Sequence, residues 1–199
     1  MRQFLVVGHD APTTPEFSLE DLPGAGRLDL LARAVVAALL HSHGVRSDSR
    51  VHLVLDDAYT FVADGATVRH LRPDERSTAA RVRNALDARD EAIGAMPAEP
   101  SPGVALYRGG LVPALERAAA DADRVVVLDE TGDPASEAKP TESPLFVLSD
   151  HHDFATSDRA AVDKHDPCLV SLGPVARHAD QAITVAHNRL DTNSFARYS

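Results

Sequence analysis

The chain has 199 residues, of which 44% are hydrophobic and 25% are charged. This length suits one large domain or two very small ones with a packed core. The apolar runs over 34–40 and 125–128 are far shorter than the roughly 20 residues of a membrane span, and no secretory signal pattern is present. We therefore expect a cytoplasmic protein without a membrane anchor. Cys168 is the single cysteine, which excludes an internal disulfide and a zinc site made of cysteines.

The charge of the chain is strongly acidic. Thirty Asp and Glu residues face 20 Lys and Arg residues, which leaves a net charge of −10, and only 2 of the basic residues are lysines. An Asp-rich, Lys-poor surface is typical of a protein kept soluble in strong salt, and a GC-rich genome is the alternative explanation. Acidic charge argues against nucleic acid binding. In strong salt that argument loses force, because binding then depends on shape, stacking and local arginine clusters.

The N-terminal half mixes strand and helix patterns. Apolar residues recur at helical spacing after Gly26, up to a closing Gly44, and Asp64-Gly65 is a hairpin signal. Prolines and a glycine over 95–103 break any regular element. The predicted elements are a strand over 3–7, a helix over 27–43, a strand over 50–55, short strands over 61–62 and 67–71, and a helix from 74 or 75 to about 91.

Short apolar strands alternate with helices in the C-terminal half. We predict strands over 104–107, 125–128, 145–148 and 168–172, with helices over 110–122 and 179–190. Continuous apolar strands of this kind are buried on both faces. The pattern predicts a single α/β domain over 1–199 with a mostly parallel sheet and helices on both faces. Ligands bind such sheets at the carboxyl ends of the strands, so a site is expected near Leu128, Leu148 and Leu172.

Several common motifs are absent or fail on their context. Gly24-Ala25-Gly26 does not follow a buried strand, and no phosphate-binding Gly-Lys-Ser/Thr loop occurs, so a dinucleotide or P-loop site is not expected. Adjacent histidines such as His151 and His152 should point in different directions, so we expect no metal site. Ser149 lacks the glycine-flanked elbow of a hydrolase nucleophile. The strand-end loops instead suit an uncharged or zwitterionic ligand held largely by main chain.

At this point the residues resemble a known family. The C-terminal strings are similar to the knotted half of the SPOUT methyltransferases, and the N-terminal strings resemble the archaeal tRNA pseudouridine-54 N1-methyltransferases. The resemblance covers nearly the whole chain and is carried by the segments 17–29, 73–76, 146–154, 170–174 and 183–184, together with Arg33. It implies S-adenosylmethionine (SAM) as cofactor, tRNA as partner, a homodimer, and a deep C-terminal trefoil knot within the cofactor-binding part, about 125–199.

The resemblance also implies which residues contact the cofactor. These positions follow the three strand ends and continue onto the last helix: Leu128, Ser149, Leu172, Gly173, Pro174, Val175, Ala176, Arg177 and Ala182. Relatives often carry Gly at the position of Ser149 and Cys at that of Ala182. Binding through the backbone tolerates both changes, and a thiol at the second position cannot be essential in this protein.

The other end of the reaction requires groups that act on the RNA. Loss of the N1 proton makes pseudouridine a good nucleophile, which asks for a base or for donors to the ring carbonyls. Asp74 and Arg76 are the candidates, although Asp74 equally suits the cap of the helix that begins there. Arg27 and Arg33 are candidates for phosphate or base contacts. The alternatives are a SPOUT methyltransferase for another RNA nucleotide and a non-enzymatic RNA-binding module.

Overall fold

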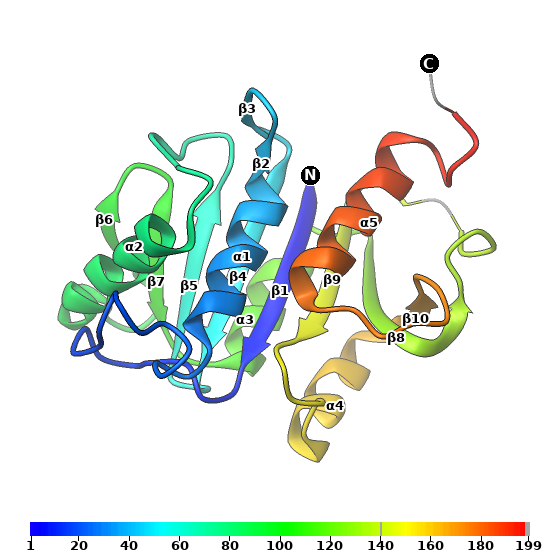
Figure 1. Ribbon diagram of the computed structural model, residues 1–199. Coiled ribbons are helices and arrows are strands. Elements are labelled where there is room, and N and C mark those ends of the chain that lie inside the picture. The colour runs from blue at the N-terminus through cyan, green and yellow to red at the C-terminus, as the bar shows by residue number, and fades with distance from the viewer. Residues whose placement is uncertain (140, 198–199) are drawn as a thin grey trace.

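The structure is a computed structural model that describes residues 1–139 and 141–197. Its centre is one eight-stranded sheet with the order β10-β8-β9-β1-β4-β5-β7-β6 (Figure 1). The strands in that order are β10 (Cys168–Ser171), β8 (Arg124–Pro134), β9 (Pro144–Ser149), β1 (Arg2–Gly8), β4 (Ser49–Leu55), β5 (Tyr59–Asp64), β7 (Val104–Arg108) and β6 (Ala98–Ser101). From β10 to β4 all neighbours are parallel, whereas β5, β7 and β6 extend the sheet antiparallel.

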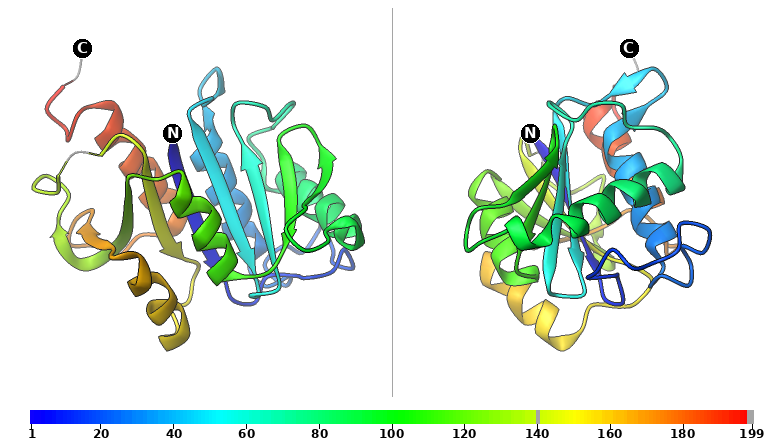
Figure 2. Two further views of the ribbon diagram at one scale, coloured as in Figure 1. Left: turned by 180° about the vertical axis from the view of Figure 1, so that it is seen from behind. Right: turned by 90° about the vertical axis from the view of Figure 1, so that its left-hand side faces the viewer.

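Helices cover both faces of this sheet, as the edge-on view of Figure 2 shows. One face carries α1 (Leu28–Leu39), α2 (Glu75–Asp87) and α5 (Ala179–Asp191), and the other carries α3 (Leu111–Ala120) and α4 (Thr156–Val162). Side chains alternate along a strand, so Phe4 and Val6 of β1 enter one core while Leu5 and Val7 enter the other. Burial on both faces explains the continuous apolar runs. In the described residues no helix is long and apolar enough to cross a membrane.

The predicted α/β architecture with a mostly parallel sheet is confirmed. The carboxyl ends of β8, β9, β10 and β1 lie at one edge of the sheet, the lower edge in Figure 1. The amino ends of α1 and α5 approach the same edge, where α1 packs against α5. Segments from four distant parts of the chain therefore meet where parallel sheets bind ligands.

The helix predicted over 27–43 is shorter in the structure. The observed helix, α1, ends at Leu39, because Leu40 adopts an extended backbone and pairs with Val45. The chain here forms a small hairpin of β2 (Leu40–His41) and β3 (Gly44–Val45). Gly44 therefore belongs to this hairpin and does not close the helix.

The predicted hairpin turn at Asp64-Gly65 is also wrong. The strand that pairs with β4 is β5, and the turn between them contains Asp56 and Asp57, which both have positive φ, 45° and 50°. Asp tolerates this left-handed conformation better than most residues, so two consecutive aspartates replace the usual glycine signal. Residues 67–71 form no strand.

Two further elements were not predicted. β6 lies within the proline-containing segment 95–103, and it is tolerated there because it is an edge strand that pairs with β7 alone. α4 has seven residues, too few for a periodic apolar pattern to stand out. Short 3₁₀ helices follow α2 at Arg89–Glu91 and α4 at Asp163–His165.

β8 is longer than the predicted strand over 125–128. After Val127 it shifts register, and Asp133 and Pro134 pair with Val170 and Ser171 of β10. The connection from β8 to β9 continues beside α5, where Arg189 donates hydrogen bonds from Nε to the carbonyl of Ala135 (2.7 Å) and from Nη2 to that of Ala138 (2.8 Å). The backbone N–H of Ala135, which directly follows β8, also donates to the carbonyl of Ser171 in β10 at 2.9 Å, so the connection contacts both β10 and α5.

Candidate functional site

A pocket of about 200 Å³ lies between the middle of β8, where the register shifts, and the carboxyl end of β9, beside the loop after β10 and the first turn of α5. Of the nine residues predicted to bind the cofactor, the structure brings eight to its wall and leaves Pro174 out of it. The eight are Leu128, Ser149, Leu172, Gly173, Val175, Ala176, Arg177 and Ala182. Residues separated by more than fifty positions therefore meet around one cavity.

The pocket combines apolar and charged surfaces. Leu128, Leu148 and Leu172 supply hydrophobic side chains, while Asp129 and Arg177 bring charges of both signs. Such a lining suits a ligand with a flat apolar part and a zwitterionic part.

Gly173 lies in the wall of this pocket with φ of +129°, a backbone conformation that L side chains rarely adopt. A Cβ atom built there would lie 3.5 Å from Nη1 of Arg177, the end of a flexible side chain. The glycine is therefore required by the backbone conformation more than by lack of space.

An ion pair in the pocket wall was not predicted. Arg159 of α4 donates from Nη2 to Oδ2 of Asp129 at 2.7 Å, and its guanidinium lies 4.9 Å from the centre of the Phe154 ring. A hydrogen bond from the Thr131 backbone N–H, together with Arg159, lowers the pKa of Asp129 to about 2. Asp129 directly follows the predicted contact Leu128, but nothing in the sequence places it beside a residue 30 positions later.

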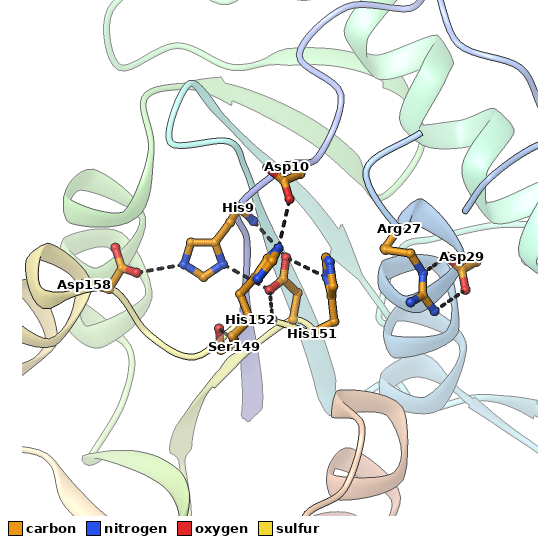
Figure 3. A network of polar contacts seen from close by, with 9 residues as sticks. His9, Asp10, Arg27, Asp29, Ser149, His151, His152 and Asp158 are labelled. Atoms are coloured by element: carbon orange, nitrogen blue, oxygen red, sulfur yellow. Dashed lines mark hydrogen bonds and ion pairs between the residues drawn. The ribbon is translucent and has the colours of Figure 1, made fainter. Parts of the chain in front are cut away.

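Polar contacts join β1 and β9 beside the pocket (Figure 3). The carboxylate of Asp150 accepts hydrogen bonds from the backbone N–H groups of His9 (2.9 Å) and His152 (2.8 Å). The Asp150 side chain is only 2% exposed. Asp150 therefore organises the loop that follows β9, and Ser149 donates to the His152 carbonyl in the same loop.

The prediction that His151 and His152 point in different directions is wrong. Their ring centroids lie 3.9 Å apart, and Asp10, His151 and His152 each place a donor atom within 4.8 Å of the others. These exposed groups also contact protein partners: His152 Nε2 lies 2.9 Å from Asp10 Oδ2, and His151 Nδ1 lies 3.6 Å from Asp150 Oδ2. Asp10 reaches the histidines because β1 and β9 are neighbours in the sheet, which brings together the loops that follow them.

The two candidate RNA-binding arginines belong to α1 or its start: Arg27 directly precedes the helix and Arg33 lies within it. Arg27 donates to both carboxylate oxygens of Asp29, at 3.0 and 3.1 Å. Burial acts to raise the pKa of Asp29, but the Arg27 guanidinium outweighs it and the pKa is lowered. Arg33 Nε lies 3.9 Å from Glu75 and 3.8 Å from Asp180, and thus joins α1 to the first turns of α2 and α5.

The candidate catalytic residues lie in a different hollow from the pocket. Asp74 caps α2, where its carboxylate accepts from Ser77 N at 2.7 Å, and this hydrogen bond lowers the pKa of Asp74. Arg76 pairs with Glu20, and its side chain is 63% exposed. Both residues line a hollow with Leu19 and Pro73. The structure thus brings the cofactor candidates together but keeps this pair apart from them within one chain.

Known proteins are similar to this chain over most or all of its length. The model of the family described as "Putative SAM-dependent RNA methyltransferase" matches residues 1–195. Proteins named tRNA (pseudouridine(54)-N(1))-methyltransferase are similar along the whole chain. The protein from Haloferax volcanii is 57% identical and that from Haloarcula marismortui is 55% identical, each over 199 residues and 100% of both chains. The one from Methanopyrus kandleri is 39% identical over 204 residues, 100% of this chain and 97% of the relative.

Among solved structures, Nep1 of Archaeoglobus fulgidus bound to S-adenosylhomocysteine has a TM-score of 0.68 over 98% of each chain. Its sequence identity is 13%, so the similarity establishes a shared fold. The mostly parallel sheet with helices on both faces is therefore an arrangement that also occurs in Nep1.

Proposed function

This chain belongs to the family of SAM-dependent RNA methyltransferases, and we propose that it methylates N1 of pseudouridine 54 in tRNA. The observation that carries the proposal is the convergence of eight predicted cofactor residues on one pocket. The names of relatives that are similar over their whole length supply the substrate. The protein would act in the cytoplasm, where it meets tRNA.

The residues of the pocket fit SAM by their chemistry. Leu128, Leu148 and Leu172 offer apolar contacts to an adenine ring, and the acidic and basic side chains offer partners to ribose hydroxyls and to the amino and carboxylate groups of the methionine part. Gly173 keeps backbone groups at the pocket surface free of a side chain. When bound, SAM supplies a methyl group that is already activated on a sulfonium sulfur.

The protein must then hold the acceptor nitrogen in line with that methyl group and exclude water. Pseudouridine is joined to its ribose through carbon, so N1 carries a proton that must leave. We propose that the ionised Asp74 accepts this proton or its hydrogen bond, while Arg76 donates to a ring carbonyl. Arg27 and Arg33 would hold the neighbouring RNA by phosphate or base contacts.

The role of Asp74 is separable from its role as a helix cap. Asn caps helices as well as Asp does, so Asp74→Asn keeps the bond from Ser77 and removes the charge. We expect the methyl-transfer rate of Asp74→Asn to fall by about a hundredfold while the helix stays stable. Asp74→Ala would lose both roles. Full activity of Asp74→Asn would contradict a part for this carboxylate in the chemistry.

We further propose that the protein works as a homodimer, as the resemblance implies. Asp74 and Arg76 lie in a hollow separate from the cofactor pocket, and a second copy would allow the two halves of a site to come from different chains. Sedimentation equilibrium should therefore give twice the chain mass. If sites are shared in this way, a mixture of Asp74→Asn chains and Gly173→Val chains should be more active than either variant alone.

We also propose that the C-terminal part of the chain forms a trefoil knot. The order β10-β8-β9 requires the chain to cross over β8 between β9 and β10, and the β8–β9 connection contacts both β10 and α5. A chain that passes inside this connection would tie the knot. A crystal structure whose backbone trace contains no knot would contradict this proposal.

The decisive experiment uses purified protein, SAM and two tRNA transcripts that differ in one base. With pseudouridine at position 54 we expect one added methyl group, located at N1 by mass spectrometry. With uridine at 54 we expect none, because the N1 of uridine is already bonded to ribose. Methylation of a ribosomal RNA fragment but not of this tRNA would favour the alternative of another RNA substrate.

A non-enzymatic RNA-binding module is distinguished by cofactor binding. A ligand present at a hundred times its dissociation constant should add about 2.7 kcal/mol to the free energy of unfolding. A rise in melting temperature with SAM is therefore expected. No rise, together with intact tRNA binding, would favour the inert module.

A further inference from the structure

His9 lies directly after β1, with its ring between two carboxylates (Figure 3). Nδ1 is 3.1 Å from Oδ1 of Asp150, and Nε2 is 2.9 Å from Oδ2 of Asp158. An ionised carboxylate only accepts hydrogen bonds, so both ring nitrogens must carry a proton and donate. The geometry therefore describes an imidazolium that bridges two carboxylates.

The two carboxylates belong to the two ends of one segment. Asp150 follows β9, and Asp158 lies in the first turn of α4, where it also accepts from the Ala155 backbone N–H at 2.8 Å. The segment from Asp150 to Asp158 contributes four residues to the pocket wall, which are Asp150, His152, Asp153 and Phe154. Arg159 comes directly after Asp158. His9 thus holds both ends of one side of the cofactor pocket.

The charges around the His9 ring explain why its two hydrogen bonds stabilise the pocket wall. Side-chain exposure is 2% for Asp150 and 15% for Asp158, so neither carboxylate is well solvated. Burial acts to lower the pKa of His9, but hydrogen bonds and charge from Asp158 and Asp150 outweigh it and the pKa is raised. Without this cation the two poorly solvated carboxylates would repel each other, and the two ends of the segment that carries them would move apart.

We propose that His9 is a positioning residue for the cofactor pocket, which it shapes by joining Asp150 to Asp158. His9 is not among the residues that line the pocket, so it would act on the cofactor through Asp150 and Asp158. The inference rests on the proposed function, because it takes the pocket to be the SAM site. Loss of His9 should therefore weaken cofactor binding and leave the transfer from bound cofactor largely intact.

The test is a double-mutant cycle on the full chain with His9→Gln, Asp158→Asn and the combination of both. S-adenosylhomocysteine is the probe, titrated by calorimetry at constant pH and salt. We expect His9→Gln to raise its Kd by about tenfold or more, and to raise the KM for SAM while kcat at saturating SAM stays within about threefold. In the Asp158→Asn background the same substitution should cost less, because one of the two carboxylates has lost its charge.

The matched control is His43→Gln, the same change at an exposed histidine in the turn of the β2–β3 hairpin, which lies at the opposite end of the sheet in Figure 1. It should leave Kd, KM and kcat unchanged. Circular dichroism and the melting temperature check that each variant is folded. If His9→Gln proves unstable, Asp158→Asn alone still tests the bridge, since it removes one of the two charges beside the His9 ring and should weaken binding.

Three results would overturn the inference: unchanged Kd in His9→Gln, a fall in kcat at unchanged KM, and additive effects of the two substitutions. The second result would place His9 in the chemistry, and the third would show that it acts without Asp158. Failure of the unmodified protein to bind S-adenosylhomocysteine would instead contradict the proposed function. The two failures are therefore distinguishable.

Discussion

Arg159 and Asp129 form an ion pair of 2.7 Å between Nη2 and Oδ2 that joins α4 to the middle of β8, where the register shifts, in the wall of the pocket. The Asp129 side chain is 13% exposed and the Arg159 side chain 42% exposed, so the carboxylate lies deeper than the cation. The pair orders two segments that contribute to one cavity. Each partner also retains polar atoms that can meet a ligand.

The first prediction concerns this pair. Arg159→Gln should raise the Kd for S-adenosylhomocysteine by about tenfold, because Asp129 loses a charged partner in the wall and its carboxylate then repels acidic neighbours. Calorimetry with the purified variant measures this change. Arg69→Gln, at an exposed position outside the pocket, is the control and should bind normally. Equal affinity in both variants would remove the ion pair from the binding site.

The second prediction separates backbone strain from cofactor contact at Gly173. Gly173→Ala should lower both the melting temperature and the affinity for S-adenosylhomocysteine, because φ is +129° and the residue lines the pocket. Gly94→Ala is the matched control: Gly94 also has positive φ, +59°, with no heavy atom within 4 Å of its built Cβ. It should lose stability alone. Loss of cofactor affinity in both variants would mean that strain, not location, is responsible.

The third prediction concerns the arginines expected to face tRNA. Arg76→Ala should weaken tRNA binding and lower the rate at saturating tRNA, since Arg76 is the most exposed of the three and is paired only with the exposed Glu20 in the contacts described. Arg27→Ala and Arg33→Ala should weaken binding with SAM affinity unchanged. Each lost phosphate contact should reduce the slope of log affinity against log salt by about one unit or less.

Binding and single-turnover methylation across a salt series measure these effects. Unchanged affinity and rate in all three variants would leave the arginines without a role in RNA binding. The salt series also tests the acidic composition, because a salt-adapted protein should keep its activity where an ordinary RNA-binding protein loses contact.

The fourth prediction is a loss of stability in mild acid. Burial lowers the pKa of His52 to about 3 and that of His187 to about 4, whereas an unfolded histidine titrates near 6.5. Between pH 6.5 and pH 4 unfolding therefore takes up protons, so the free energy of unfolding should fall with decreasing pH by about 1.4 kcal/mol per unit for each histidine. His9 does not oppose this trend, because its raised pKa keeps it protonated there in both states.

Urea unfolding at fixed salt across this pH range provides the measurement. His187→Gln should make the dependence on pH shallower, because one of the two buried histidines no longer titrates. The same substitution at the exposed His43 should leave the slope as it is. A slope unaffected by His187→Gln would mean that other groups cause the acid sensitivity.

The fifth prediction concerns metal ions. Methyl transfer to a nitrogen needs no Lewis acid, so we expect dialysis against EDTA to leave the rate of methylation unchanged. If a metal ion binds, Asp10, His151 and His152 are the residues that could hold it, because their potential ligand atoms lie close together. Inactivation by EDTA that zinc reverses, and that His152→Asn abolishes, would contradict the expectation.

The sequence alone determined the α/β class and three segments that line the candidate pocket. Leu128, Ser149 and Leu172 were identifiable because a parallel strand buried on both faces is a continuous apolar run, and its end is visible where polar residues begin. Local signals failed where the chain used less common solutions, such as Asp56 and Asp57 in place of a glycine turn and a proline-containing edge strand.

Only the tertiary structure decided which strand ends are neighbours. The sheet places β1 beside β9, and so brings His9 to residues that are 141 and 149 positions away in the chain. It likewise brings Arg159 to Asp129. Strand order depends on how helices and cores pack over the whole sheet, and that information is spread over residues far apart in the chain. The polar contacts that shape the pocket therefore could not be derived from any local pattern.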